Sequence, residues 1–437
     1  MMIRICLCLV LFVAVPALCQ VAPGATGPPA DDQMRTPPPV NGEAYPVATG
    51  AETRSNQLRI GLNFQTAHDD NVIGIETAIP VADFSYIIGA ALAFDQLTPR
   101  LHQTFTYGSD FTLYQHTSAR NESDQNASGN FVFRISPHTT ASLRDSFQKT
   151  TNVFNQPYAG VFGSTQPQAP AVVAPFADQL GNSSSGDLKY QFSSNGMIGG
   201  AGTFATLSYP NPAQANGLSD SNTKGGSAFY NLRLSSTQYT GVSYQYSTMS
   251  ASLANAQSDT QTQTLNGFYT IYLGNSLTLS ASGGPEHFDL HESQASSVAS
   301  WTPNLTASIG WQRDHTNLAA SYSRTIMGAG GLLGAFKSNN VNANARWQFA
   351  RTWTTGLAGT YAIQKNVLPV VLLNNSGGHA VSATALVQHP IGEHFTAELG
   401  YTRLHQSYNG IPAISENPDG DREYVSINYH FDRPLGR

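Results

Sequence analysis

Residues 424–431, close to the end of the chain, alternate strictly between two kinds of side chain. Successive side chains of a β-strand point to opposite faces, so this segment predicts a strand with two different faces. One face carries Val425, Ile427, Tyr429 and Phe431, and the other carries Tyr424, Ser426, Asn428 and His430. Such a strand suits a wall with lipid on one side and water on the other.

The same alternation recurs over residues 305–312, 341–349 and 395–402. A slip by one residue would exchange the two faces, so these segments specify their own orientation. After the N-terminus no run of about 18 apolar residues occurs, which excludes transmembrane helices. We therefore predict an all-β fold, a transmembrane antiparallel up-and-down β-barrel, because closure satisfies every backbone hydrogen bond without an edge. An aromatic girdle is expected from Trp311, Trp347, Phe349, Phe395, Tyr429 and Phe431.

The spacing of the predicted turns indicates how many strands the barrel contains. Short turns recur about every 40 residues, and we place them near Leu97, His138, Ser194, Ser236, Asn275, Asp314, Arg351 and Glu393. Longer polar or glycine-rich stretches lie between them, at 116–125, 155–186, 211–224, 292–300, 374–379 and 409–421. This alternation of long loops and tight turns is typical of outer-membrane barrels. Nine units predict about 18 strands, within a range of 14–18. A solenoid or propeller has a similar period, and a soluble β-sandwich or β-helix is the other alternative.

Two segments fit this pattern poorly. Residues 84–94 are apolar on both faces, through Ile87, Ala91 and Ala93. Asp145, within 143–147, falls on the apolar face. A bulge or bend in that strand, or a shifted register, is therefore expected there.

The ends of the chain differ from the middle. Residues 1–19 are typical of a signal peptide, with Arg4, an apolar stretch and a cleavage site before Gln20. Cys19 as a lipidation site is the alternative. All three cysteines lie in this segment, so the mature chain would contain none. Residues 20–56, rich in Pro, Gly and Ala, predict a disordered periplasmic tether without a separate plug domain. The barrel is expected over 57–431, and 432–437 form a short periplasmic tail.

Several short stretches carry a family resemblance: residues 98–102, 107–114, 143–147 and 431–437. Over roughly 57–437 the chain resembles large outer-membrane β-barrel proteins of acidobacterial type. This resemblance implies the barrel and a bacterial outer-membrane location, but no substrate. The chain is also similar in strand number and length to 18-stranded sugar and carboxylate porins, without their ligand-specific residues. The strand with Val425, Ile427, Tyr429 and Phe431 resembles the terminal insertion signal of outer-membrane barrels. That likeness implies the barrel-assembly machinery and outer-membrane lipids as partners.

Most classes of chemistry find little support in the sequence. Removing residues 1–19 leaves 21 basic against 28 acidic residues, a balance that does not favour nucleic-acid binding. No spacing links Ser, His and Asp into a triad, so an enzyme is not predicted and no cofactor is implied. The glycine-rich run 328–334 lacks the Lys-Ser/Thr of a phosphate loop. His287, Asp289 and His291 share one face of a strand and could chelate a metal ion, but a polar strand end explains them better, and no metal site is predicted.

The charges of the inner face suggest a transport role. If the apolar face is outward, six basic residues point inward, and among residues at membrane depth Glu398 is the one acid that clearly opposes them. The six are Arg59, Arg134, Arg144, Lys189, Arg233 and Arg346. Basic residues that line a pore favour anions. They could equally brace the barrel by pairing with neighbouring side chains. We therefore predict a passive porin-like channel for small polar or anionic solutes, and the alternative is a structural or surface-interaction barrel with adhesive loops and a lumen occluded by residues 155–186. The solute and the oligomeric state do not follow from the sequence.

Overall fold

The chain forms a single antiparallel sheet of 18 strands within the residues that the structure describes. The structure, a computed structural model, describes residues 34–37, 39, 56–72, 80–151, 177–211, 218–253, 256–274, 276–293, 297–328, 333–367, 377–408 and 419–435. The strands are β1 (Gln57–Asp69), β2 (Asp83–Leu97), β3 (Leu101–Tyr114), β4 (Glu122–Arg134), β5 (Thr139–Thr150), β6 (Gln179–Gln191), β7 (Gly196–Ser208), β8 (Asp220–Ser235), β9 (Gln238–Leu253), β10 (Ala256–Leu273), β11 (Leu277–Glu292), β12 (Val298–Arg313), β13 (Thr316–Gly328), β14 (Ala335–Gln348), β15 (Thr354–Asn366), β16 (Gly377–Ile391), β17 (Phe395–Tyr408) and β18 (Asp419–Pro434).

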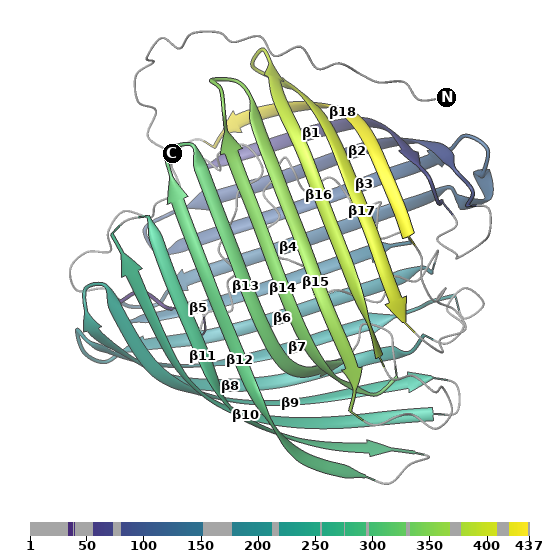
Figure 1. The fold of residues 1–437 in the computed structure, drawn as a ribbon. Helices are drawn as coiled ribbons and strands as arrows, with labels where there is room; N and C mark the ends of the chain where they lie inside the picture. The colour runs from purple at the N-terminus through teal and green to yellow at the C-terminus, as the bar shows by residue number, and fades with distance from the viewer. Residues whose placement is uncertain are drawn as a thin grey trace.

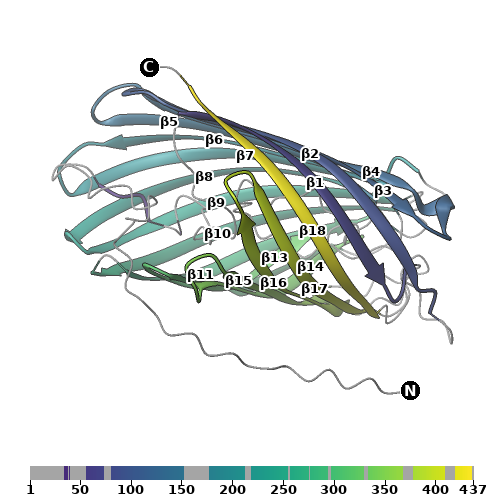
Figure 2. The same cartoon turned by 90° about the horizontal axis from the view of Figure 1, so that it is seen from above.

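The sheet closes into a barrel. Each strand pairs with its neighbours in sequence, and β1 pairs with β18 from Gln57–Pro434 to Asp69–Arg422. Figure 1 shows the strands of the near wall crossing those of the far wall, as strongly tilted strands do. β1 and β18 lie side by side in Figure 2. The prediction of an up-and-down barrel with 18 strands is confirmed.

The two ends of the barrel differ. All eight predicted short turns lie between strands at one end, which we call the turn end, together with the start of β1 and the end of β18. The opposite end, the loop end, carries the longer connections, such as 70–82 and 151–178. The link between β9 and β10 is the exception at the loop end, because residues 254–255 alone separate these strands.

The two faces of the wall also differ. The outer face carries most of the exposed large apolar side chains, including Leu62, Trp301 and Leu399, which are 54%, 66% and 61% exposed. The inner face carries buried Ser, Thr, Asn and Gln side chains, and Ser426 and Asn428 are each 1% exposed. The strands hold 12 to 18 residues, and 9–11 residues suffice for a tilted strand to cross a bilayer. No helix long and apolar enough to cross a membrane occurs in the described part of the chain.

The strands extend further than the sequence indicated. β4 begins at Glu122, β6 at Gln179 and β8 at Asp220, within stretches predicted to be loops. β18 continues past Phe431 to Pro434, and Asp432 pairs with Arg59 of β1. These segments are polar on both faces because they lie at the ends of the barrel, beyond the apolar band, where both faces meet water.

The predicted irregularity at Asp145 is absent. β5 pairs without interruption with β4 and β6 through this residue, which lies on the same face as Leu143. The Ser184 hydroxyl on β6 donates a hydrogen bond to the Asp145 carboxylate. A local polar partner therefore accommodates the charge, and no bulge is needed. In β2, Ile87 and Ala91 are buried on the inner face, so this strand is apolar on both sides as the sequence indicated.

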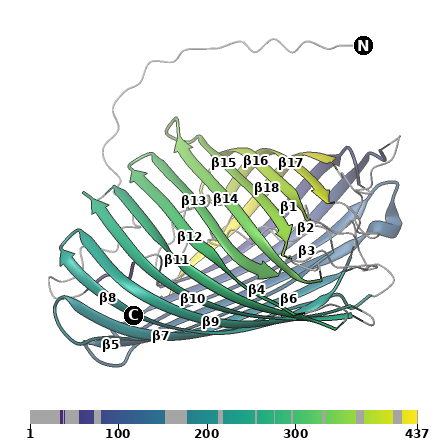
Figure 3. The ribbon, with the colours of Figure 1, turned by 60° about the horizontal axis from the view of Figure 1, so that its bottom comes forward.

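One pair of neighbouring strands separates at the loop end. β12 pairs with β13 only up to Leu305 and Arg324. Beyond that point β12 pairs with β11 as far as Val298, and β13 pairs with β14 as far as Gly328. We call this point of divergence the fork. Figure 3 shows this side of the barrel, with the green strands β10–β15 in front of the blue strands of the far wall.

Candidate functional site

The candidate site is the lumen, whose wall is built mainly of small hydroxyl and amide side chains. Inward positions alternate with the apolar outer positions along each strand, so the polar wall follows directly from the sequence pattern. Neighbouring strands are linked by hydrogen bonds across this wall, such as Thr270 to Ser280 at 2.7 Å. A wall of this kind is compatible with water in the lumen.

Apolar side chains meet across the lumen at the loop end. A buried cluster, here called the mouth cluster, contains Ala177, Tyr209, Leu218, Phe336, Ala380 and Tyr408. The first three come from the connections next to β6, β7 and β8, and the others from β14, β16 and β17, on the opposite side of the ring. Phe336 and Tyr408 are fully buried, and the Tyr408 hydroxyl donates to Gln364 at 3.0 Å. The connections therefore reach inward and narrow the loop end.

The position of Tyr209 within the mouth cluster is fixed locally. Its backbone N–H donates to the Asp220 carboxylate at 2.8 Å, which links the two ends of the β7–β8 connection. Burial raises the pKa of the Tyr209 phenol, so this side chain stays neutral at physiological pH. The mouth cluster is thus an uncharged constriction.

A piece of the N-terminal segment narrows the turn end. Met34 is buried against Met197, Phe229 and Tyr239, on the inner wall of β7–β9. Its backbone N–H donates to Gln191 at 3.1 Å. The Arg35 guanidinium lies 4.9 Å from the centre of the Tyr272 ring, a cation–π distance. Residues 34–37, which the sequence assigned to a disordered tether, therefore dock inside the barrel.

This docking makes a prediction about access to residue 34. A chain that lacks residues 1–19 contains no natural cysteine, so Met34→Cys introduces a single thiol. We expect a water-soluble maleimide to modify it slowly. Labelling should be roughly ten-fold faster when Tyr272→Ala and Asn231→Ala remove the cation–π contact of Arg35 and the hydrogen bond that Asn231 donates to the Arg35 carbonyl oxygen. The measurement is the labelling rate of the barrel in detergent. Ser236→Cys, in an exposed turn, serves as the rapid control; labelling of residue 34 at the same rate would contradict the docking.

Acidic side chains gather on the inner face at the loop end of β1–β4. Asp69, Asp83, Asp110 and Asp124 are all buried there. Asp69 forms a 2.8 Å ion pair with Arg422, which is 2% exposed. Asp83 accepts hydrogen bonds from the backbone N–H groups of His116 and Thr117, at 3.0 and 2.8 Å. This part of the inner wall is therefore acidic, and ion pairs and hydrogen bonds hold its carboxylates in place.

The six predicted inward basic residues all lie on the inner face by strand alternation. Arg59 pairs with Asp432 at 2.8 Å, Lys189 with Asp187 at 3.2 Å, and Arg233 donates to Asn195 at 3.0 Å. Arg134, Arg144 and Arg346 share this face with neighbouring polar residues and have interaction partners of their own. Arg59, Arg134, Lys189, Arg233 and Arg346 lie within a few residues of the turn end.

The inner face carries more acid than the sequence indicated. Besides Glu398, the buried acids at the loop end, Asp187 and Glu286 also point inward. The expectation of six basic residues against one acid is therefore wrong. The reason is that Asp124 was assigned to a loop, and that the other inward acids lie outside the segments whose alternation was assigned from the sequence. The loop end of the lumen is therefore acidic, whereas at the turn end the five basic residues only narrowly outnumber the inward acids Asp95, Asp187, Glu398 and Asp432.

The candidate metal ligands do not converge. His291 Nδ1 lies 3.5 Å from Asp289 Oδ1, whereas the His287 ring packs on Trp301 at a centroid distance of 4.9 Å. Over the described ranges, no group of three or more His, Cys, Asp or Glu side chains could hold a metal ion.

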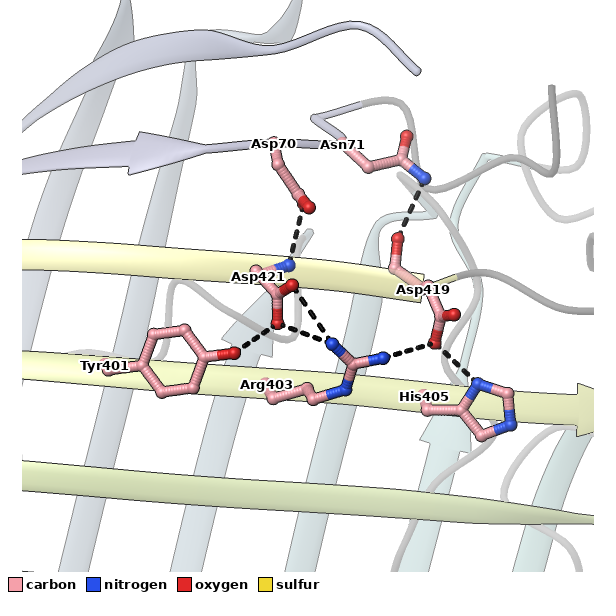
Figure 4. Close-up of polar contacts among 7 residues, drawn as sticks. All are labelled: Asp70, Asn71, Tyr401, Arg403, His405, Asp419 and Asp421. Carbon is pink, nitrogen blue, oxygen red and sulfur yellow. Dashed lines mark hydrogen bonds and ion pairs between the residues drawn. The ribbon is translucent and has the colours of Figure 1, made fainter. Parts of the chain in front are cut away.

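The outer face has a polar cluster of its own at the loop end, shown in Figure 4. Arg403 of β17 forms ion pairs with Asp419 and Asp421 of β18, at 3.7 and 3.1 Å. His405 lies 2.6 Å from Asp419, and the Tyr401 hydroxyl donates to Asp421 at 2.6 Å. Below this cluster β18 presents Val425, Ile427 and Phe431 outward, at 42–50% exposure. Trp347, Phe349 and Phe395 are likewise exposed near the turn end, as a girdle requires.

A closed barrel with an apolar outside and a polar inside is now established. The fold is that of an outer-membrane β-barrel of porin-like architecture. No protein-family model matches the chain, and no curated protein does. Among solved structures it is similar to the ferric citrate transporter FecA in the unliganded form, with 10% identity and a TM-score of 0.44 over 85% of this chain and 64% of that one. It is also similar to Pseudomonas aeruginosa OpdQ, with 10% identity and a TM-score of 0.41 over 86% and 97%. A third similar structure is Pseudomonas aeruginosa OccK2 (OpdF), with 10% identity and a TM-score of 0.42 over 86% of this chain and 98% of that one. At this identity, conclusions about solutes depend on the chain's own residues.

Proposed function

We propose that the protein is a passive channel of the bacterial outer membrane for small polar solutes, including anions. The closed barrel with a polar inner wall carries this proposal, because 18 strands enclose a lumen wide enough for water unless side chains fill it. The loop end faces the outside of the cell and the turn end the periplasm, following the usual loop asymmetry. The mouth cluster and residues 34–37 are the two constrictions of the path.

Delivery to the membrane is part of the same proposal. Residues 1–19 act as a signal peptide that directs export to the periplasm. The outward apolar side chains of β18 are recognised by the barrel-assembly machinery. Those side chains, Val425, Ile427, Tyr429 and Phe431, lie on the terminal strand that closes the barrel against β1. Lipid then surrounds the apolar outer face.

Planar-bilayer recording tests the channel directly. Purified barrel should give discrete conducting steps, small for its strand number because of the two constrictions. Absence of conducting events from folded protein would refute the channel. Folding is checked on the same sample by the shift in gel mobility between heated and unheated barrel.

The six inner basic residues are proposed to line the pore. Together with the acids at the loop end they separate charge along the axis, so the field in the lumen is asymmetric. Anions should concentrate at the turn end, where the path is narrow and salt screens poorly. The current through the open channel should consequently differ between the two voltage polarities.

Neutralising part of this basic wall should change ion selectivity. The triple variant Arg134→Gln, Arg144→Gln and Arg233→Gln should lower the chloride-to-potassium permeability ratio, because these side chains attract anions into the lumen. The reversal potential in a salt gradient measures the ratio. The control variant Lys149→Gln and Lys224→Gln removes two positive charges from the outer face and should leave the permeability ratio unchanged. An unaltered ratio in the triple variant would show that the arginines only brace the wall.

A second candidate function is a structural or surface-interaction barrel with an occluded lumen. The mouth cluster favours it, since apolar side chains from opposite walls are in contact at the loop end. The occluding residues that the structure describes are Ala177, Tyr209 and Leu218; most of the predicted occluding stretch 155–186 lies outside the described residues, and from Gln179 onward it belongs to β6. The two functions differ in whether the unmodified barrel conducts: a channel conducts before the mouth cluster is reduced, and an occluded barrel conducts only afterwards.

A further inference from the structure

Three basic side chains lie together on the outer face near the loop end. Lys337 of β14 and Lys365 of β15 are direct cross-strand partners. Arg324 of β13 is paired with Leu305, whose side chain is 44% exposed on the outer face, and with Asn339, two residues from Lys337. Adjacent residues on the inner face confirm the orientation, because Ser338 and Gln364 are 0% and 1% exposed. We call Arg324, Lys337 and Lys365 the basic trio.

The basic trio has no counter-charge in the described part of the protein. No ion pair joins any of the three to a described carboxylate, and Arg324 Nε is a buried donor without a hydrogen-bond partner. Like charges directly opposite on neighbouring strands destabilise a sheet, and a buried donor without a partner costs further free energy. A bound anion would therefore stabilise the basic trio, because it would supply the missing counter-charge and a hydrogen-bond acceptor.

The cluster of Figure 4 provides a comparison on the same face and at the same end. There, Arg403 and His405 are both satisfied by Asp419 and Asp421. His379 of β16 lies between the two groups, with its ring 6.3 Å from Tyr361 of β15 and 5.3 Å from His405. Among the residues that the structure describes, carboxylates neutralise the Figure 4 cluster but not the basic trio.

The depth of the basic trio indicates the kind of anion. Tyr322 and Tyr361 lie on the outer face, two and four residues closer to the barrel centre than Arg324 and Lys365. Tyrosines on the lipid-facing side mark the membrane interface. Cations just beyond them lie at the level of lipid headgroups. Arg324 also lies at the fork; beyond it Ile326, on the same face of β13, is buried against Phe288 and Leu290 of β11, so this face of β13 is covered beyond Arg324.

We propose that Arg324, Lys337 and Lys365 bind the phosphate of a phosphorylated lipid in the outer leaflet of the membrane. The guanidinium and the two ammonium groups form charge-assisted hydrogen bonds with the phosphate oxygens. The acyl chains lie along the apolar face of β12–β15, which includes Leu305, Val341 and Leu357. The proposal shares with the proposed function only the orientation of the barrel in the membrane and does not require an open lumen.

Native mass spectrometry of the purified full-length barrel tests this site. The barrel is incubated in detergent with bisphosphorylated lipid A, monophosphoryl lipid A or phosphatidylcholine, and bound lipid is counted. We expect retention to fall in that order. In the variant Lys337→Gln and Lys365→Gln, affinity for lipid A should fall about five-fold for each lysine removed. Lys149→Gln and Lys224→Gln remove two lysines from the outer face of β5 and β8 and should retain lipid A as the unmodified barrel does.

Several results would overturn the proposal: equal retention of lipid A and phosphatidylcholine, undiminished retention by the lysine variant, or equal loss in the control. Displacement of lipid A by millimolar inorganic phosphate would show a site for the free ion instead. If the double variant does not fold, Lys365→Gln alone is used, since this side chain is exposed. Lipid binding without conductance would leave this site standing and refute the channel.

Discussion

Replacing Tyr209 and Leu218 by alanine is expected to raise the single-channel conductance by roughly two-fold, because side chains at a constriction set the width of the path. Both residues reach from the β7–β8 connection to Phe336 and Tyr408 on the opposite wall. Removing them leaves the β-strands intact and opens the loop end. Planar-bilayer recordings at fixed salt and voltage give the conductance.

Tyr244 and Leu265 provide a matched control. They are direct cross-strand partners on the outer face, 45% and 54% exposed. Tyr244→Ala and Leu265→Ala remove the same two side chains from the lipid side, so the conductance should not change. If neither double variant conducts more than the unmodified barrel, the mouth cluster does not limit the current. A silent barrel that begins to conduct only after the Tyr209 and Leu218 changes would show that the native lumen is occluded.

Replacing Asp69 by asparagine is expected to destabilise the barrel by about 3–5 kcal/mol, because it leaves a buried arginine without its counter-charge. Arg422 is 2% exposed, and Asp69 contacts it through a 2.8 Å ion pair across the β1–β18 seam. Ser85 alone cannot replace the carboxylate, since its hydroxyl is a weak partner at 3.3 Å. Unfolding by guanidinium in lipid vesicles measures the loss.

The other end of the same seam supplies the control. Asp432, paired with Arg59, has a side chain that is 35% exposed, so Asp432→Asn should cost much less. The double variant Asp69→Asn and Arg422→Gln should recover part of the stability, because it removes both charges. Equal losses for Asp69→Asn and Asp432→Asn would show that burial of the first pair contributes nothing.

Most of the fold could be predicted from the sequence, because a membrane-spanning strand carries its own orientation. The alternation in residues 341–349 and 424–431 fixes which face meets lipid, and the eight short turns fix the strand count. Strand ends were harder to predict. Above the apolar band both faces meet water, so 179–186 and 220–224 lose the alternation while remaining strands.

The constrictions of the lumen could not be predicted, since they depend on contacts between distant parts of the chain. Nothing local in Met34 indicates that it packs on Phe229, and Tyr209 meets Tyr408 only because the barrel closes. The charge of the lumen was mispredicted for a related reason. Asp110 and Asp124 are cross-strand partners on the inner face, but the sequence assigned Asp124 to a loop.

The two ion pairs of the closing seam also act as a check on its register. In the observed register Asp69 faces Arg422 and Arg59 faces Asp432. A shift of β18 by one residue in one direction would set Asp69 against Glu423 and Arg59 against Arg433. A shift in the other direction would set Asp69 against Asp421. Both shifts place like charges in direct opposition and turn the polar face toward lipid. The charges of Asp69, Arg422, Arg59 and Asp432 therefore favour a single register between the first and last strands, and so help the barrel to close in the correct alignment.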